Sequence, residues 1–189
     1  MSLKLKILML VCVALALLTL TISSTATAKE NKALSAKHQK IIQDFPTVRH
    51  ISNDALYGMK EEDVIVFDIR EADEFHVSHM EASILVSPDI SSDAFLSQYA
   101  EKVRGKTVVF YCSVGQRSSI LAEKVQQDLT ALGSGPVYNL EGGLFKWHND
   151  SLPLVTAAAE PTDYIHPYNH FWGRMVNQKR KHRYKLSDK

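Results

Sequence analysis

The sequence predicts an α/β domain with a mostly parallel five-stranded sheet and helices on both of its faces. Short apolar runs alternate along the chain with segments of helical periodicity, the pattern of strand–helix–strand units. The run at residues 64–67 is apolar at every position, as expected of a strand that is covered on both faces. Residues that cap helices or form turns separate the runs.

Each element has a local signal. Apolar side chains at positions 34, 41, 42 and 45 predict an amphipathic helix ahead of the domain. Capping residues at 52–54 and 91–93 begin the next two helices, and Gly133 ends a longer one. The expected helices are residues 34–45, 55–59, 93–103, 118–132 and a short one from Gly142 through Trp147. The expected strands are residues 48–51, 64–67, 84–86, 107–111 and 137–140.

The first 28 residues form a separate segment that we interpret as a cleavable export signal. Lys4 and Lys6 precede an apolar run of 16 residues, and the segment ends Ala-Thr-Ala. A membrane anchor is the alternative, but a spanning helix needs about 20 apolar residues. Cys12 follows Val11 inside the run, which does not fit a lipoprotein signal. We therefore expect cleavage near Ala28 and a periplasmic or secreted protein.

Signal cleavage would leave Cys112 as the only cysteine, which excludes a disulfide framework in the mature chain. A lone cysteine is either an inert buried residue or a working thiol, and its neighbours decide between the two. Cys112 follows the strand at 107–111, so it lies at the carboxyl edge of the sheet, where active sites of such sheets occur.

The segment after Cys112 favours a reactive thiolate. A tight loop between a strand and a helix turns backbone N–H groups inward, and the following helix adds its positive N-terminal end. Gly115 allows a backbone conformation that other residues resist, and Arg117 adds a permanent positive charge suited to oxyanions. We expect these features to stabilise the thiolate of Cys112 and to attract anionic substrates.

Four segments resemble the rhodanese family in order and spacing. Residues 112–118 read C-S-V-G-Q-R-S and resemble the active-site loop C-x-x-G-x-R-S. Residues 68–75 resemble the stretch D-x-R-x-x-x-E-[FY], and the segment from Glu141 through Trp147 to Pro153 resembles the closing G-G…W…L-P segment. Residues 78–83 read S-H-M-E-A-S where the family has G-H-I-P-G-A, so both glycines are replaced. The likeness covers residues 46–155.

The resemblance implies a sulfurtransferase in which Cys112 carries sulfur as a persulfide, taken from a donor such as thiosulfate or a persulfide and passed to a thiol or cyanide. We expect no cofactor and no metal, because the H-x-x-H spacing of His76 and His79 has no acidic or cysteine ligand nearby. Substrate contacts are expected from the loop residues Ser113, Val114, Gly115, Gln116 and Arg117. Residues expected to brace the loop are Asp68, Arg70, Glu74, His79, Gly142 and Gly143.

Two alternatives stay open at this point. The related phosphatases have five residues between the cysteine and the arginine, whereas this loop has four, which favours sulfur transfer. The second alternative is a carrier module that binds a partner or relays sulfur without notable turnover. The oligomeric state stays undetermined.

The sequence therefore divides into a signal peptide (1–28), an N-terminal helical extension (29–45), a rhodanese-like domain (46–155) and a C-terminal extension (156–189). Residues 164–172 contain four aromatic side chains, and we expect them to pack back on the domain. From Arg174 onward the chain has seven Lys and Arg residues and one Asp. We expect this basic tail to be solvated. Contact with an anionic membrane is a further possibility, while export argues against nucleic acid.

Overall fold

The computed structural model describes residues 30–185. Its centre is a five-stranded sheet in the order β1-β5-β4-β2-β3, in which every neighbouring pair is parallel. The predicted signal peptide and the last four residues lie outside the described residues. The strands of this sheet are β1 (His50–Ile51), β2 (Val64–Asp68), β3 (Ile84–Leu85), β4 (Thr107–Tyr111) and β5 (Val137–Leu140).

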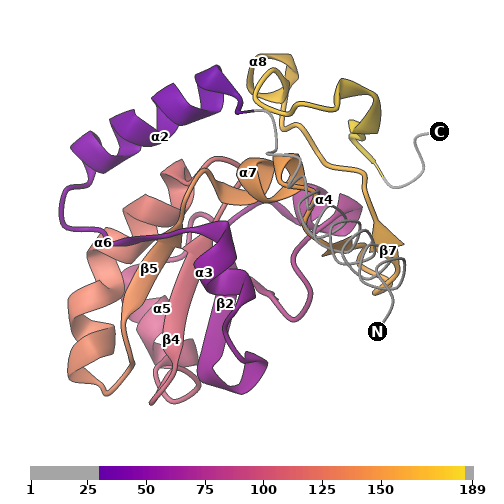
Figure 1. The fold of residues 1–189 in the computed structure, drawn as a ribbon. Coiled ribbons are helices and arrows are strands. Elements are labelled where there is room, and N and C mark those ends of the chain that lie inside the picture. The colour runs from indigo at the N-terminus through magenta and orange to yellow at the C-terminus, as the bar shows by residue number, and fades with distance from the viewer. Residues whose placement is uncertain (1–29, 186–189) are drawn as a thin grey trace, which may run out of the picture.

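Helices cover both faces of the sheet, as the sequence predicts (Figure 1). Alternate residues of a strand point to opposite faces. In β4, Val109 and Tyr111 belong to one hydrophobic cluster, and Val108 and Phe110 belong to the other. The first cluster packs under α3 (Asn53–Tyr57) and α7 (Gly143–Asn149), and the second under α5 (Ser92–Tyr99) and α6 (Gln116–Ala131).

Smaller elements complete the chain. They are α2 (Lys32–Asp44), η1 (Glu61–Asp63), α4 (Ala72–Val77), β6 (Leu154–Val155), β7 (Pro161–Thr162), α8 (His170–Gly173) and η2 (Lys179–Lys181). Strands β6 and β7 form a separate antiparallel pair. None of the helices within residues 30–185 has the length and apolar character needed to span a membrane.

The C-terminal extension packs on the domain, and the expectation of a solvated tail from Arg174 is wrong for its first residues. Ile165 is completely buried, and Met175 and Val176 are almost so, all three in the cluster that contains Val109. The charge pattern suggested solvation because basic side chains dominate the segment. Its few apolar residues nevertheless supply enough buried surface to hold it down.

Candidate active site

Cys112 lies in a loop that joins the end of β4 to the start of α6. It is 1% exposed, and its Sγ accepts a hydrogen bond of 3.2 Å from the backbone N–H of Gly115. Gly115 has a φ of +95° and is the N-cap of α6. This left-handed turn lets α6 begin at Gln116, two residues earlier than predicted. The sulfur therefore faces the positive end of a 16-residue helix.

The N-terminus of α7 holds this loop from behind. Leu144 donates its backbone N–H to the Cys112 carbonyl at 2.8 Å, and Phe145 donates to the Ser113 carbonyl at 3.0 Å. These contacts satisfy two backbone N–H groups at the start of α7 that have no partner within the helix. They also hold the Cys112 and Ser113 carbonyl groups toward α7. Gly143, with a φ of +58°, permits the approach, because a Cβ there would lie 2.3 Å from the Cys112 carbonyl oxygen. Gly142 likewise has a positive φ, of +68°.

Asn139 on β5 is a structural support that sequence reasoning missed. Its Nδ2 donates to the Gly115 carbonyl at 3.2 Å, and its Oδ1 accepts from the Ser118 hydroxyl at 2.6 Å. The Ser119 hydroxyl donates to the same Gly115 carbonyl at 2.7 Å. Asn139 is fully buried, so these bonds replace the water it loses. A polar residue inside an otherwise apolar strand was the available signal.

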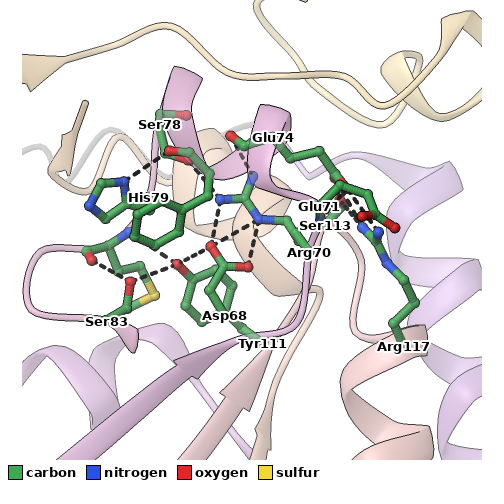
Figure 2. Close-up of polar contacts among 12 residues, drawn as sticks. Asp68, Arg70, Glu71, Glu74, Ser78, His79, Ser83, Tyr111, Ser113 and Arg117 are labelled. Atoms are coloured by element: carbon green, nitrogen blue, oxygen red, sulfur yellow. Dashed lines mark hydrogen bonds and ion pairs between the residues drawn. The ribbon is translucent and has the colours of Figure 1, made fainter. Parts of the chain in front are cut away.

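Arg117 is held by Glu74 in a two-pronged ion pair (Figure 2). Its two terminal nitrogens donate to the two Glu74 carboxylate oxygens at 2.8 and 2.9 Å. Ser113 donates its hydroxyl to Glu74 at 2.6 Å, so one carboxylate fixes both ends of the loop. Burial would raise the pKa of Glu74, but the hydrogen bonds and charge of Arg117 hold it below its ordinary value. Burial would likewise lower the pKa of Arg117, and Glu74 with Cys112 raises it instead.

Asp68 and Arg70 form a completely buried ion pair beside the loop (Figure 2). Arg70 contacts Asp68 at 2.6 Å and donates to the Ser78 carbonyl at 2.7 Å. Tyr111 donates its hydroxyl to Asp68 at 2.6 Å. Burial is the main cause that raises the pKa of Tyr111 well above its ordinary value, so the phenol keeps its proton. The pair ties the end of β2 to α4, the helix that carries Glu74, and so acts on the loop through Glu74.

His79 contacts α4 and β6. Its ring stacks on Phe75 with 3.6 Å between ring centres, and its Nδ1 lies 3.0 Å from the Phe75 carbonyl. Its backbone pairs with Val155. His79 therefore fixes α4 and the 78–83 turn. In that turn Ala82 has a φ of +58°, at the position where the family stretch has glycine. Ala82 thus adopts a left-handed conformation that favours glycine.

A pocket of about 190 Å³ opens over Cys112. Four loop residues line it, namely Ser113, Val114, Gln116 and Arg117, together with Tyr168 and Trp172 of the C-terminal extension. The Tyr168 ring centre lies 5.2 Å from the Arg117 guanidinium carbon. Lys37 of α2 donates to Gln116 at 2.6 Å and lies 5.6 Å from the centre of the Trp172 ring. The sequence predicts that residues 164–172 pack on the domain, but not that they form a wall of this pocket.

No group of three or more His, Cys, Asp and Glu side chains within residues 30–185 is arranged to hold a metal ion. Cys112 is a free thiol.

Comparisons with known proteins agree with this geometry. A family model described as the rhodanese-like domain matches residues 52–150. The thiosulfate sulfurtransferase GlpE of Coxiella burnetii is 31% identical over 90 residues, covering 47% of this chain and 76% of GlpE. The tRNA uridine(34) hydroxylase of Bacillus mycoides is 31% identical over 97 residues, but these make up only 28% of that protein. A thiosulfate sulfurtransferase structure from Pseudomonas aeruginosa shares the fold, with a TM-score of 0.51 and 18% identity over 69% of this chain and 24% of its own.

Proposed function

Because the chain belongs to the rhodanese-like domain family, we propose that it is a sulfurtransferase that carries sulfane sulfur on Cys112. The observation that carries this proposal is the position of the Cys112 sulfur. It accepts the Gly115 N–H, faces the start of α6 and borders a pocket large enough for a small donor. Backbone donors at a helix start favour a negative charge on sulfur, both on the thiolate and on a persulfide.

The proposed cycle has two displacements. The Cys112 thiolate attacks the outer sulfur of a donor such as thiosulfate. A new bond forms between the two sulfurs, the bond within the donor breaks, and sulfite leaves with the electron pair. A thiol or cyanide then attacks the outer sulfur of the Cys112 persulfide and regenerates the thiolate. No oxidant or cofactor takes part, and the attacking species in this cycle is the thiolate itself, so the displacement calls for no general base.

Loop length supports sulfur transfer over phosphate chemistry. Four residues, 113–116, separate Cys112 from Arg117, and Gly115 is the residue whose N–H reaches the sulfur. A tighter loop brings its donors onto a single sulfur atom rather than around a tetrahedral phosphate. The neutralisation of Arg117 by Glu74 also leaves less positive charge for a phosphate dianion.

The test is mass spectrometry of the purified protein before and after thiosulfate, followed by addition of cyanide. We expect Cys112 to gain the mass of one sulfur atom, and we expect reductant or cyanide to remove it. The Cys112→Ser variant should fold and gain no sulfur, since serine is nearly isosteric and no other thiol lies in the described chain. Sulfur that loads but is not turned over would identify a carrier module. Absence of loading with every donor would refute sulfur transfer.

We also propose that residues 1–28 direct export, with the mature chain beginning at Lys29. The basic start, the apolar run and the small residues at its end support this assignment. N-terminal sequencing of the protein recovered from a periplasmic or culture fraction tests it. A protein that retains Met1 and stays with the membrane would be anchored instead.

A further inference from the structure

Two aromatic residues of the C-terminal extension, Tyr168 and Trp172, form one wall of the Cys112 pocket. Their position there indicates which class of sulfur donor the pocket suits. The segment that holds Tyr168 and Trp172 lies outside residues 52–150, the part that matches the family model. What these two side chains do in the pocket is therefore a property of this chain rather than of the matched domain.

The structure holds the two aromatic residues firmly at the pocket. Tyr168 has a φ of +63°, a strained value for a residue with a side chain, and its N–H donates to His166 Nδ1 at 3.0 Å. Asn169 caps α8 by accepting the Trp172 N–H. Trp172 also packs against the core cluster that contains Ile165. The aromatic wall is thus part of the fold, and its shape is set before a substrate arrives.

The electrostatics of the pocket disfavour a substrate with two negative charges. Arg117 is the only pocket-lining residue of the described chain with a permanent positive charge, and Glu74 already compensates it. Lys37 stands at the rim, where it bonds Gln116. A Cys112 thiolate and a dianion would therefore bring together three negative charges, balanced by the start of α6 with its Gly115 N–H and by Lys37 at the rim. Like charges at this distance in a partly dry site repel strongly.

The pocket walls suit a single apolar group. Val114, Tyr168 and Trp172 supply apolar and aromatic surface around a space of about 190 Å³. An apolar cavity of about 150 Å³ is known to take up a benzene molecule. One ring-sized group therefore fits beside the sulfur, where it would lose contact with water and pack against the two aromatic side chains.

We propose that Tyr168 and Trp172 make the site selective for sulfane-sulfur donors that carry one negative charge and an apolar group, such as organic thiosulfonates, over the inorganic dianion thiosulfate. This inference rests on the proposed sulfur transfer. The Cys112 thiolate attacks the outer sulfur of the thiosulfonate, a bond between the two sulfurs forms, and the donor's sulfur–sulfur bond breaks. The organic sulfinate leaves with the electron pair, so charge and atoms balance without a further reactant.

The experiment measures kcat/KM with cyanide as acceptor for three donors: thiosulfate, methanethiosulfonate and benzenethiosulfonate. The two thiosulfonates share charge and reacting atoms and differ in the organic group, so a change of their ratio in a variant reports the contact of the pocket with that group. We expect wild type to prefer the benzene compound at least about tenfold, because even one methylene group in an apolar pocket is worth roughly 10- to 200-fold. Trp172→Ala should lower that ratio by about tenfold.

Two further variants guard against a simple loss of folding. Tyr168→Gly removes a ring that is 47% exposed and tolerates the φ of +63°, so the core stays intact. It should lower the same ratio. Tyr57→Ala is the control, because the Tyr57 ring on α3 is 60% exposed and does not line the pocket. Its ratio should equal that of wild type.

The outcomes separate the two proposals. Suppose that Cys112 loads with sulfur but that kcat/KM for benzenethiosulfonate and for methanethiosulfonate is about equal, or that neither variant changes their ratio. Either result would overturn the selectivity and would leave the proposed sulfur transfer intact. An equal fall for all three donors in Trp172→Ala and Tyr168→Gly would also overturn it, since the wall would then support the loop without discriminating. Failure of every donor to load wild-type Cys112 would remove sulfur transfer itself.

Discussion

Glu74 is the residue on which the geometry of the site depends most. Its carboxylate is 1% exposed, and it receives hydrogen bonds from Ser113 and Arg117 at opposite ends of the loop. Its own helix is fixed by Arg70, whose guanidinium reaches the Glu74 carbonyl. A buried carboxylate with this set of donors is stabilised in its charged form, so one side chain holds both the shape and the charge of the loop.

Replacing Glu74 by glutamine should destabilise the protein by about 1–3 kcal/mol at pH 7, the range for hydrogen bonds to charged groups. The pKa of Glu74 lies below its ordinary value of 4.5 in the folded protein. Its contribution is therefore present above pH 4.5 and is lost as the pH falls through the lower folded pKa. Urea unfolding of both proteins between pH 7 and pH 3 should show their difference shrinking below pH 4.5. A difference that stays constant over this range would show that the charge of Glu74 contributes nothing.

Gly143 packs closely on the loop that carries Cys112, and Gly105 offers a matched control for testing this contact. A Cβ at Gly143 would meet the Cys112 carbonyl at 2.3 Å, whereas a Cβ at Gly105, which also has a positive φ of +75°, would meet nothing within 4 Å. Gly105→Ala should therefore cost only the conformational penalty, about 1–2 kcal/mol. Gly143→Ala should cost more and also lower sulfur transfer, because α7 must move off the loop. Equal costs in thermal unfolding, or full transfer by Gly143→Ala, would contradict the close packing of α7 on the loop.

At the scale of elements, α2 is joined to β1 by two histidines. The ring centres of His38 and His50 lie 4.9 Å apart, edge to face. Burial first, and then the charge on His38, lowers the pKa of His50 to about 4. Burial also lowers the pKa of His38, although Glu141, 3.6 Å away, opposes this and Lys146 adds to it. Burial of the two rings in the contact between α2 and the sheet therefore favours their neutral forms.

Acid should weaken this contact at a pH where most carboxylates are still charged. The unfolded chain takes up a proton on His50 near its ordinary pKa of 6.5, but the folded protein does so only near 4. The contribution of His50 to the free energy of unfolding is thus fully present above pH 6.5. It falls by about 1–3 kcal/mol as the pH drops toward 4. His50→Gln should remove that part of the slope in urea unfolding, whereas replacing the exposed His170 by glutamine should not. An unchanged slope in His50→Gln would contradict the prediction.

The sequence predicts well those helices and strands whose own residues carry an apolar pattern, a cap or a turn. Strands β4 and β5 have the predicted bounds because each is a mainly apolar run that follows a turn. Helix α4 was not predicted, since it has six residues, two of them buried, and depends on the Arg70 and Glu74 contacts. The loop from Cys112 to Arg117 is continuous and carries its own motif. Its partners Glu74, Asn139, Tyr168 and Trp172 come from distant segments, so only the fold brings them to it.

At the scale of the whole molecule, the two extensions meet over the active site. Helix α2 and the segment around α8 lie on the same side of the molecule, above α7 (Figure 1). The Asn31 side chain donates to the Arg174 carbonyl and to Asn177, and the Asn149 side chain on α7 donates to the Met175 carbonyl. Lys37 and Trp172 then meet beside Gln116. The segments outside the matched domain are therefore coupled to each other and to the loop.

Ile165 tests whether the C-terminal extension unfolds with the domain. It is completely buried in the cluster of Val109 and Leu140, and its backbone bonds Lys181 and Arg183. Ile165→Ala should cost about 2–4 kcal/mol, as expected for a cavity in a packed core. Ile120→Ala, at a position 40% exposed on α6, should cost less than about 1 kcal/mol.

Tryptophan fluorescence reports Trp147 on α7 and Trp172 on α8, and circular dichroism reports the whole fold. In urea both signals should change in one transition, which Ile165→Ala shifts to lower concentration. The opposite result would be a fluorescence transition at lower urea than the circular dichroism transition, or an equal loss of unfolding free energy in the two variants. Either would mean that the extension packs weakly and that the pocket wall opens without unfolding the domain.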